Sequence, residues 1–571
     1  MFRILLPLFC LLLPLTAKAE LEITIYAFRT SNDLAFKTYS YDVVTPDKIK
    51  SIPSLNLVQS GPEGQMTSTF LRGTNSNHTL ITLNGIAIKD HSTPGGTDDI
   101  SQHSFLGVEQ VEVIKGPMGS VYGPNSIGGT INMVTQANTE NSVSVSTGSN
   151  NTNTQTIKLG KFIEDANTLV DMRIENETSD GISVVDGNED DGFKNRNYII
   201  QTETYNVIPG YTMKTSLIET NNKTNLDKSS DYTDYTADWQ FNNYYLSMQN
   251  KDEEYTINHT KHDRVYDDKG TVDTYKNDTT TLLAKKTIHN NKNSSYTLGT
   301  EYEYNDIEFD TNIAGYDSNV NKNRTNNGYF YNVDQTLVSG VQLNAGVRYD
   351  TPNTFDNQLT YRIGAENNGV RISYATGYKA PTVYEMYGKN NYGFLGNKNL
   401  IPEESKTYEI GYRWDKGDIV FFKTEIDNLL TYSNNTYVND TKKSDRHGVE
   451  LGLTHKIGDV NIQNNTAFVI AEDGNGTEIV RKPKWTNTTN FNLSNWNLDV
   501  NYYGSHLDID SQTYATIKMP SVTTADLFYE MAKGDLTFYG KLSNITDETY
   551  ERPDGYNQVG RSFNIGFKKS F

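Results

Sequence analysis

Cysteine is almost missing from this sequence. Its one cysteine, Cys10, lies within the first 19 residues, so the rest of the 571-residue chain contains no thiol. A fold held together by disulfides is therefore excluded for that remainder. Proline is also scarce, with 15 residues in the whole chain. Because proline removes a backbone donor from a sheet, its scarcity suits long strands joined by polar loops.

Positively charged residues are fewer than negatively charged ones. Lysine and arginine total 51 against 71 aspartates and glutamates, which gives a formal net charge of −20. Nucleic acid is a poor partner for such a chain. Composition does not decide whether the acidic side chains line a lumen, face outward in loops or bind divalent cations. No nucleophile–base constellation stands out, so the sequence does not favour an enzyme.

The chain has a single long apolar run. It extends from Ile4 to Leu15, follows Arg3 and precedes the small-residue sequence Ala17-Lys18-Ala19. The run is shorter than the roughly 20 residues that span a bilayer as a helix. We therefore predict that residues 1–19 form a secretory signal peptide with cleavage before Glu20.

Beyond residue 19 the hydropathy is polar, with a chain mean of −0.63. A transmembrane β-barrel nevertheless fits, because it places apolar side chains at every second residue. Apolar and polar residues alternate in this way over Val341–Asp350 and Trp496–Tyr502. The 38 tyrosines, against 22 phenylalanines and 4 tryptophans, suit the two membrane interfaces. Such a sheet must close, because an open edge in hydrocarbon leaves backbone groups unpaired.

One segment, residues 108–135, is the most informative part of the sequence for the fold. Val108–Lys115 has the pattern of a strand, Gly116-Pro117 ends it, and glycine-rich sequence leads into a second extended run that ends at Thr135. A phosphate-binding loop is disfavoured, since no helix pattern and no Gly-Lys-Ser/Thr sequence follow. The segment resembles the end of the plug domain of TonB-dependent outer-membrane receptors, where the plug leads into the barrel.

This resemblance implies an organisation for the whole chain. It predicts a TonB box segment at 20–30, an α+β plug domain at 31–138 and an all-β transmembrane barrel of about 22 antiparallel strands at 139–571. The plug would fill the barrel lumen. The resemblance also implies a location in the bacterial outer membrane, surrounded by its lipid, and a monomeric protein.

The predicted TonB box has a short alternating pattern. Ile23 and Ile25 share one face, and Glu22, Thr24 and Tyr26 share the other. The pattern is similar to the segment by which these receptors engage the periplasmic protein TonB through β-augmentation. The residues implied are Glu22, Ile23, Thr24, Ile25, Tyr26 and Ala27. An ordinary first strand of the plug is the alternative.

Two plug loops are predicted to form an apex that contacts the substrate. The residues that the resemblance implies are Asn75, Asn77, His78, Lys89, Asp90, His91 and Ser92. The three histidines at 78, 91 and 103 match no compact metal-ligand spacing. The sequence therefore favours solvated loop histidines over a metal or haem site.

Closely spaced carboxylates suggest a cation site. The candidate ligands are Asp186, Glu189, Asp191, Asp227 and Asp231. Carboxylate oxygens in outward loops could supply the ligands that Ca²⁺ needs. Glu189 and Asp191 stand where the cobalamin receptors carry a D-x-D-G-F sequence, here with Glu in place of the first Asp. A structural Ca²⁺ is therefore one expectation, and a solvated acidic loop is the other. No other cofactor is required.

Several stretches resemble the vitamin B12 (cobalamin) receptor branch of the family. They are Phe70–His78, Asp98–Gln102, Gly377–Pro381, Gly396–Leu400 with Pro402–Lys406, and Asn544–Tyr550 through Gly555–Arg561. Haem receptors carry a histidine between motifs like those at 378–381 and 397–400, and this chain has none there. The predicted function is TonB-dependent active uptake of a scarce ligand, with cobalamin favoured. A ferric-siderophore receptor is the alternative, and a passive channel or surface adhesin is the rival from another class.

Overall fold

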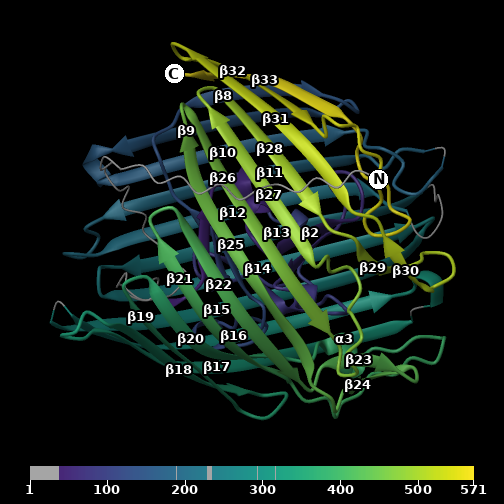
Figure 1. Cartoon of the computed structure of the whole chain (residues 1–571), viewed down its shortest axis with the longest axis horizontal. Coiled ribbons are helices and arrows are strands. Elements are labelled where there is room, and N and C mark those ends of the chain that lie inside the picture. Colours follow the sequence, from purple (N-terminus) through teal and green to yellow (C-terminus); the bar gives the residue numbers. More distant parts are fainter. Residues whose placement is uncertain (1–37, 188, 228–233, 292, 316) are drawn as a thin grey trace.

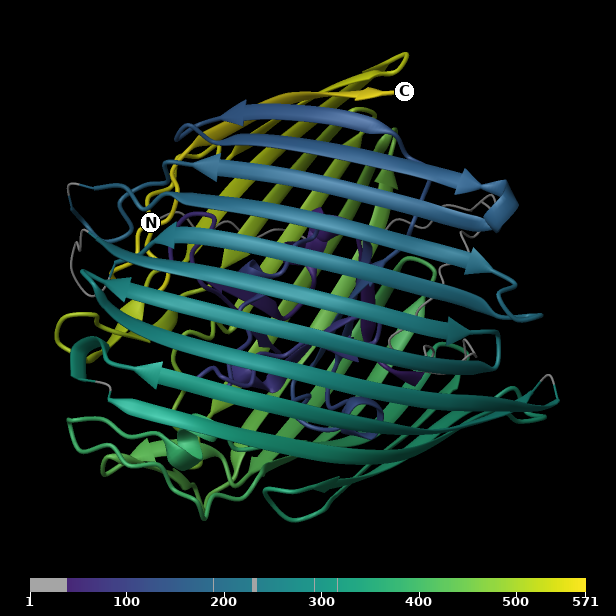
Figure 2. The ribbon, with the colours of Figure 1, turned by 180° about the vertical axis from the view of Figure 1, so that it is seen from behind.

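The computed structural model describes residues 38–571, apart from 188, 228–233, 292 and 316. Over these residues, 22 antiparallel strands form a closed barrel around a smaller domain, drawn in purple inside the barrel in Figures 1 and 2. The predicted fold class is confirmed. The predicted signal peptide at 1–19 and the predicted TonB box segment at 20–30 lie outside the described residues.

Each barrel strand pairs with its neighbours, and β33 pairs with β8 to close the ring. The strands are β8 (Ser142–Gly148), β9 (Asn153–Ile163), β10 (Thr168–Ser179), β11 (Phe193–Tyr205), β12 (Thr212–Asn225), β13 (Tyr235–Gln249), β14 (Glu253–Asp268), β15 (Thr271–Asn291), β16 (Ser294–Thr311), β17 (Ser318–Thr336), β18 (Gln342–Pro352), β19 (Gln358–Asn367), β20 (Val370–Lys379), β21 (Glu403–Trp414), β22 (Gly417–Asp427), β25 (Ser444–Ile457), β26 (Val460–Glu472), β27 (Trp485–Leu493), β28 (Trp496–Tyr503), β31 (Val522–Lys533), β32 (Leu536–Ser543) and β33 (Ser562–Ser570).

Alternation along each strand produces an apolar exterior and a polar interior. On β21, Tyr408 and Ile410 are 49% and 53% exposed on the outer face, whereas Thr407 and Glu409, which alternate with them, are buried. On β33, Phe563 and Ile565 also face outward. An apolar outer face beside a polar inner face is the pattern of a barrel that meets lipid outside and water inside.

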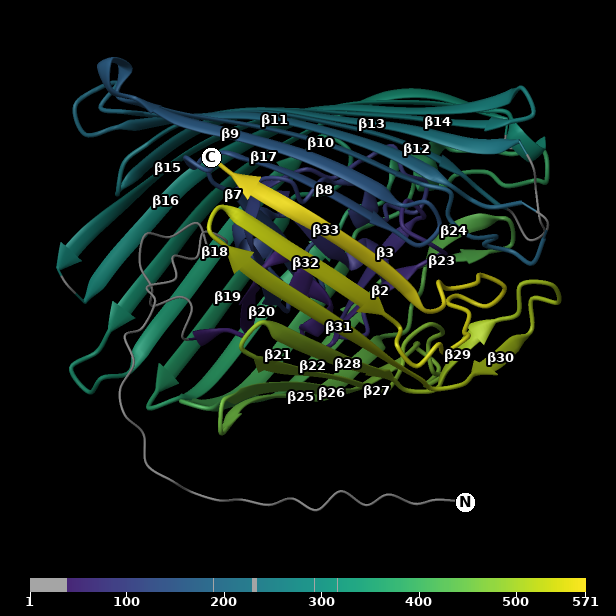
Figure 3. The same ribbon diagram turned by 90° about the horizontal axis from the view of Figure 1, so that it is seen from above.

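The two ends of the barrel differ. At one end, here called the loop end, long connections include 380–402, 428–443, 504–521 and 544–561. They carry two hairpins, β23 (Leu430–Ser433) with β24 (Thr436–Asn439) and β29 (His506–Ile509) with β30 (Thr516–Met519), which Figure 3 shows at the same end. At the other end, the turn end, connections such as 415–416 and 494–495 are tight. Bacterial barrels have short periplasmic turns and longer extracellular loops, so the loop end faces outward.

The plug is built on a five-stranded sheet in the order β1-β6-β7-β4-β5, with β2 and β3 paired separately. Its strands are β1 (Tyr41–Val44), β2 (Leu55–Gln59), β3 (Thr67–Leu71), β4 (Thr79–Leu83), β5 (Ile86–Ala87), β6 (Val108–Lys115) and β7 (Gly129–Thr135). Short 3-10 helices η1 (Pro46–Ser51), η2 (Ser76–His78) and η3 (Ile100–Gln102) connect them. The sheet packs around fully buried residues that include Ile81, Val111 and Ile131.

The predicted strand, glycine turn and strand over 108–135 are present, because β6 pairs antiparallel with β7. The turn also contains a short helix, α2 (Gly119–Tyr122), which the sequence pattern did not indicate. Gly129 has a φ of +147°, and a Cβ there would lie 2.2 Å from the carbonyl oxygen of Ile114. Only glycine fits this close approach of two strands.

Further short helices lie in the barrel connections: η4 (Glu164–Ala166), η5 (Ile313–Gly315) and α3 (Val383–Tyr387). Within the described part of the chain, no helix is both long enough and apolar enough to cross a membrane.

Candidate functional site

The two predicted substrate loops meet at the loop end of the plug. Ser76 Oγ lies 3.1 Å from Thr97 Oγ1, and Asn77 Nδ2 donates to the Gly95 carbonyl at 2.9 Å. The loop at 75–78 therefore lies against the loop that carries residues 89–92. Convergence of these two stretches agrees with the predicted apex, and their contact with a substrate stays a prediction.

Most of the predicted substrate residues are buried within this apex. Lys89, Asp90 and Ser92 are between 1% and 5% exposed. Asp90 pairs with Arg264 Nε of β14 at 2.8 Å and accepts hydrogen bonds from Ser92. These side chains join the plug to the barrel wall. Asn75, Asn77 and His91 are the predicted residues that stay partly exposed.

Two side chains of the apex have lowered pKa values. Burial lowers the pKa of Lys89 to about 8. Burial, followed by the charges of Lys89 and Arg324, lowers the pKa of His91 to about 3, so this imidazole is neutral at physiological pH. One nitrogen of a neutral imidazole donates a hydrogen bond and the other accepts one, so the ring can bind an uncharged ligand.

The expectation of solvated histidines is wrong for His78 and His103, whereas His91 stays partly exposed. His78 is fully buried, and its Nε2 lies 2.6 Å from Glu403 Oε2 on β21. Burial lowers the pKa of His78 despite that carboxylate. His103 is also buried, 3.4 Å from Asp98. The barrel wall covers both rings, which sequence spacing could not show. Among the described residues, no group with metal-ligand geometry contains a histidine.

An aromatic wall stands beside the apex, and sequence reasoning missed it. Ring centroids lie 6.2 Å apart for Tyr275 and Phe309, 5.8 Å for Phe309 and Tyr384, 5.1 Å for Tyr384 and Phe394, and 5.8 Å for Phe394 and Tyr437. The rings come from β15, β16, α3, the 380–402 connection and β24. Because they are remote in sequence, no local pattern could have grouped them. Tyr275, Phe309, Tyr384 and Phe394 are buried, so these rings pack against one another as a hydrophobic cluster, with Tyr387 and Tyr437 partly buried at its edge.

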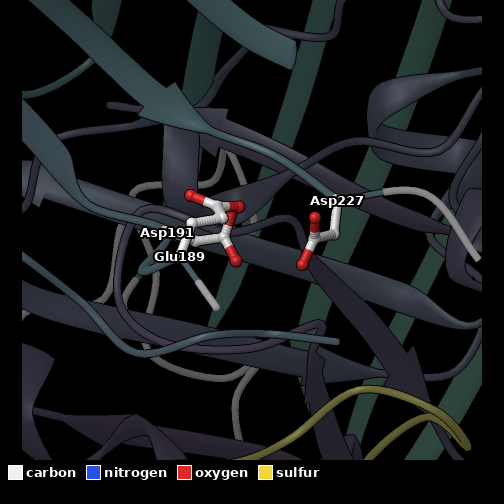
Figure 4. Close-up of side chains that lie close together, drawn as sticks. All are labelled: Glu189, Asp191 and Asp227. Atoms are coloured by element: carbon white, nitrogen blue, oxygen red, sulfur yellow. The ribbon is translucent and has the colours of Figure 1, made fainter. Parts of the chain in front are cut away.

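Three of the predicted cation ligands do come together. Glu189, Asp191 and Asp227 each offer one carboxylate oxygen, and these three oxygens all lie within 4.8 Å of one another (Figure 4). Asp191 is fully buried, and its Oδ1 has no hydrogen-bond partner in the described structure. Burial, together with the charges of Asp227 and Glu189, raises the pKa of Asp191 to about 8. A cation would remove the repulsion that raises this pKa.

The other two predicted ligands are placed differently. Asp186 is exposed and lies outside the cluster. Its Oδ1 instead accepts a hydrogen bond from Asn557 Nδ2 at 2.9 Å. Asp231 lies outside the described residues. The site that the structure brings together is therefore smaller than the one that the sequence predicts.

The acidic loop also touches the plug. Val184, whose backbone N–H donates to Asp191 Oδ2 at 2.9 Å, packs against Gly61. Gln65 Nε2 donates to the Asn225 carbonyl at 2.7 Å, just before Asp227. These contacts join the carboxylate cluster to the plug loop beside it.

A buried charge cluster fixes the plug to the barrel. Arg72 donates from Nη1 to Glu409 at 2.8 Å and from Nη2 and Nε to Glu450 at 2.9 and 3.0 Å. Lys115 lies 3.3 Å from Glu450 and 2.8 Å from Asp42. Arg72 is 1% exposed, so its contacts with Glu409 and Glu450 are shielded from solvent, whereas the Asp42 side chain is 30% exposed. We call these five residues the latch.

A closed 22-stranded barrel with an apolar exterior and a folded domain in its lumen defines a plugged receptor of the outer membrane. The chain belongs to the TonB-dependent receptors: the model of the TonB dependent receptor-like β-barrel matches residues 138–545, and the TonB-dependent receptor plug domain matches 44–130. The protein is located in the bacterial outer membrane.

Individual relatives and solved structures share low sequence identity with this chain. The vitamin B12 transporter BtuB of Vibrio cholerae is 24% identical over 561 residues, which cover 92% of this chain and 89% of the relative. Among solved structures, the siderophore receptor PirA from Acinetobacter baumannii has a TM-score of 0.77 at 14% identity, covering 96% of this chain and 100% of that one. The ferric yersiniabactin uptake receptor FyuA from Yersinia pestis has a TM-score of 0.73 at 17% identity, covering 95% and 100%. These structures share the fold.

Proposed function

We propose that the protein actively takes up cobalamin across the outer membrane, energised through TonB. The ligand assignment rests on the similarity to a vitamin B12 transporter along most of the chain. The cluster of three loop carboxylates, at the positions that the resemblance to cobalamin receptors implies, supports it. A neutral His91 and the amides of Asn75 and Asn77 at the apex suit an uncharged, amide-bearing ligand.

The proposed partners follow from the same assignment. TonB would pair with residues 22–27, ligand would bind the loop end and the apex, and force from the inner membrane would then move the plug. The protein would act as a monomer and would catalyse no covalent step.

A ferric siderophore is the second candidate ligand. The observation that favours it is the partly exposed Tyr387, which packs against the aromatic wall and whose ring centre lies 5.2 Å from Lys322 Nζ and 5.5 Å from Lys398 Nζ. Aromatic rings with cations beside them suit an anionic, ring-bearing ligand. The apex and the wall thus point to different ligand charges, and binding measurements distinguish them.

Titration of cyanocobalamin into the purified protein tests the assignment. We expect binding that strengthens when millimolar Ca²⁺ is added, because the cation would order the loops around Asp191 and the plug loop that they contact. Ferric enterobactin serves as the comparison ligand. Binding of the ferric siderophore without binding of cyanocobalamin would transfer the assignment to the second candidate.

We also propose that Glu189, Asp191 and Asp227 bind Ca²⁺. Three carboxylates supply hard oxygen ligands, and the buried, unpaired Oδ1 of Asp191 fits a cation. Asp191→Asn should weaken Ca²⁺ binding by at least about ten-fold, because affinity depends on the ligand charge. Asp186→Asn is the matched control, since Asp186 lies outside the cluster, and it should leave the affinity unchanged. Equal effects of the two substitutions would contradict the assignment.

Calcium binding should also depend on pH. Because the pKa of Asp191 is raised to about 8, its carboxyl group holds a proton at neutral pH, which the cation must displace. The affinity for Ca²⁺ should therefore rise roughly ten-fold per pH unit below the pKa of Asp191. Above that pKa the affinity should level off. Calorimetry in buffers of different ionisation enthalpy measures the proton release. An affinity that does not change with pH would show that Asp191 is not a ligand.

A further inference from the structure

A buried lysine lies beside the apex without a carboxylate partner. Lys482 belongs to the connection 473–484 at the loop end and is 7% exposed. Its Nζ donates to Asn75 Oδ1 at 2.9 Å and lies 5.5 Å from the ring centre of Phe70. It forms no ion pair with any carboxylate that the structure describes. Because an ammonium group has three donors, two of them find no hydrogen-bond partner among the described residues.

The charged groups that act on Lys482 are positive. Arg446 of β25 is fully buried, its Nε donates to the Gly73 carbonyl at 2.9 Å, and its Nη2 has no hydrogen-bond partner within the described part of the chain. Arg481, the preceding residue, pairs with Asp508 at 2.7 Å. Burial, followed by the charges of Arg446 and Arg481, holds the pKa of Lys482 well below its ordinary value. An anion beside the amine would restore its charge.

The plug loop 73–75 lies where such an anion would bind. Arg446 and Lys482 both donate to this loop, one to its backbone and the other to the Asn75 side chain. Burying a cation without an opposite charge is unfavourable, and an apolar side chain of similar size would avoid that penalty. The Asn75 amide oxygen occupies the position of an anionic oxygen on Lys482. Asn75 is partly exposed, so a ligand group that replaces its amide reaches the lysine.

The chemistry of this site indicates one small anionic group. Lys482 offers a single ammonium, which binds phosphate or carboxylate oxygens as a point charge. The rest of the apex is different, because His91 is neutral and Asn77 presents an amide. A ligand that suits both parts has an uncharged, amide-rich body that carries one anionic group.

We propose that Lys482 binds a phosphate or carboxylate group of the ligand, which takes the place of the Asn75 amide. The inference rests on the proposed uptake function and adds one requirement to its ligand, a single anionic group on an amide-rich body. Cyanocobalamin meets this requirement, since its amide-bearing ring system carries one phosphodiester. Arg446 adds positive potential at the same plug loop, which favours the anion further.

A pair of related ligands tests the role of Lys482. Dicyanocobinamide has the amide-bearing ring system of cyanocobalamin and lacks its phosphodiester. In the purified full-length protein, Lys482→Met should weaken cyanocobalamin binding at least about ten-fold and leave dicyanocobinamide binding unchanged, because it removes only the ammonium group. Lys484→Met is the matched control, since Lys484 is 43% exposed and pairs with Glu478 at 2.7 Å. It should change neither affinity. An equal loss for both ligands, or no loss, in Lys482→Met would overturn the proposal.

Further arms separate this proposal from the cobalamin assignment. Thermal unfolding checks that Lys482→Met is folded, and Lys482→Gln replaces it if it is not. If the parent protein binds neither corrinoid, the cobalamin assignment fails and ferric enterobactin, an anionic chelate, becomes the probe. Lys482→Met should then weaken its binding at least about ten-fold relative to Lys484→Met, and equal affinities would overturn the anion site. If that ligand does not bind either, inorganic phosphate should protect Lys482, and not Lys484, from reductive methylation. Absence of protection would overturn the site.

Discussion

Deletion of residues 22–27 should abolish accumulation of the ligand in cells while leaving ligand binding intact. The expected loss is complete, because uptake against a concentration gradient needs an energy source and this segment is the predicted contact with TonB. Uptake of labelled cyanocobalamin at low external concentration measures the effect, and calorimetry on the purified variant measures binding.

A scrambled sequence of the same six residues is the control for length. It should lose uptake as the deletion does, since β-augmentation depends on the side-chain pattern as well as on the backbone. Uptake that survives both changes would support the passive channel instead. Loss of binding in the deletion variant would show that the segment supports the plug, as an ordinary strand would.

Replacement of Arg72 by alanine should destabilise the plug without opening the barrel. The substitution leaves Glu409 and Glu450 buried with one guanidinium fewer between them. Removing one partner of a buried ion pair costs about 3–5 kcal/mol, because the remaining charge stays desolvated. Hydrogen–deuterium exchange of the β3 and β6 amides should reveal this loss as faster opening of the plug.

Lys48→Ala is the matched control for the latch. Its partner Asp499 also belongs to the barrel, and the pair is partly exposed. Breaking it should cost less than about 1 kcal/mol. Similar exchange rates in Arg72→Ala and Lys48→Ala would mean that the apolar core of the plug, and not the latch, holds it in place.

Much of the architecture could be predicted from local patterns. Alternation over Val341–Asp350 and Trp496–Tyr502 coincides with β18 and β28, and the glycine-rich segment after Val108 forms the β6–β7 pair. Asn84-Gly85 is a sequence typical of a tight turn and forms one between β4 and β5, with φ values of +50° and +79°. Each of these features depends on neighbours in sequence, so the pattern alone determines it.

The site was predictable only in part. Carboxylate spacing led to Glu189, Asp191 and Asp227, because loops at one end of a barrel are close in space. Arg72 and its partner Glu450 are 378 residues apart, and no local pattern connects them. The histidines were misjudged for the same reason: His78 is covered by Glu403, which lies 325 residues further along the chain. Burial by remote strands is not visible in a single sequence.

The pairing of β33 with β8 has a consequence for biogenesis. The seam joins the first barrel strand to the last, in a register that begins with Asn564 opposite Gly148. No ribosome-bound intermediate can therefore complete the cylinder, because its final partner has not yet been synthesised. Pairing across so long a stretch of chain is intrinsically slow, and two unpaired edges stay exposed until it occurs. The nascent receptor would thus depend on periplasmic chaperones to protect those edges until insertion.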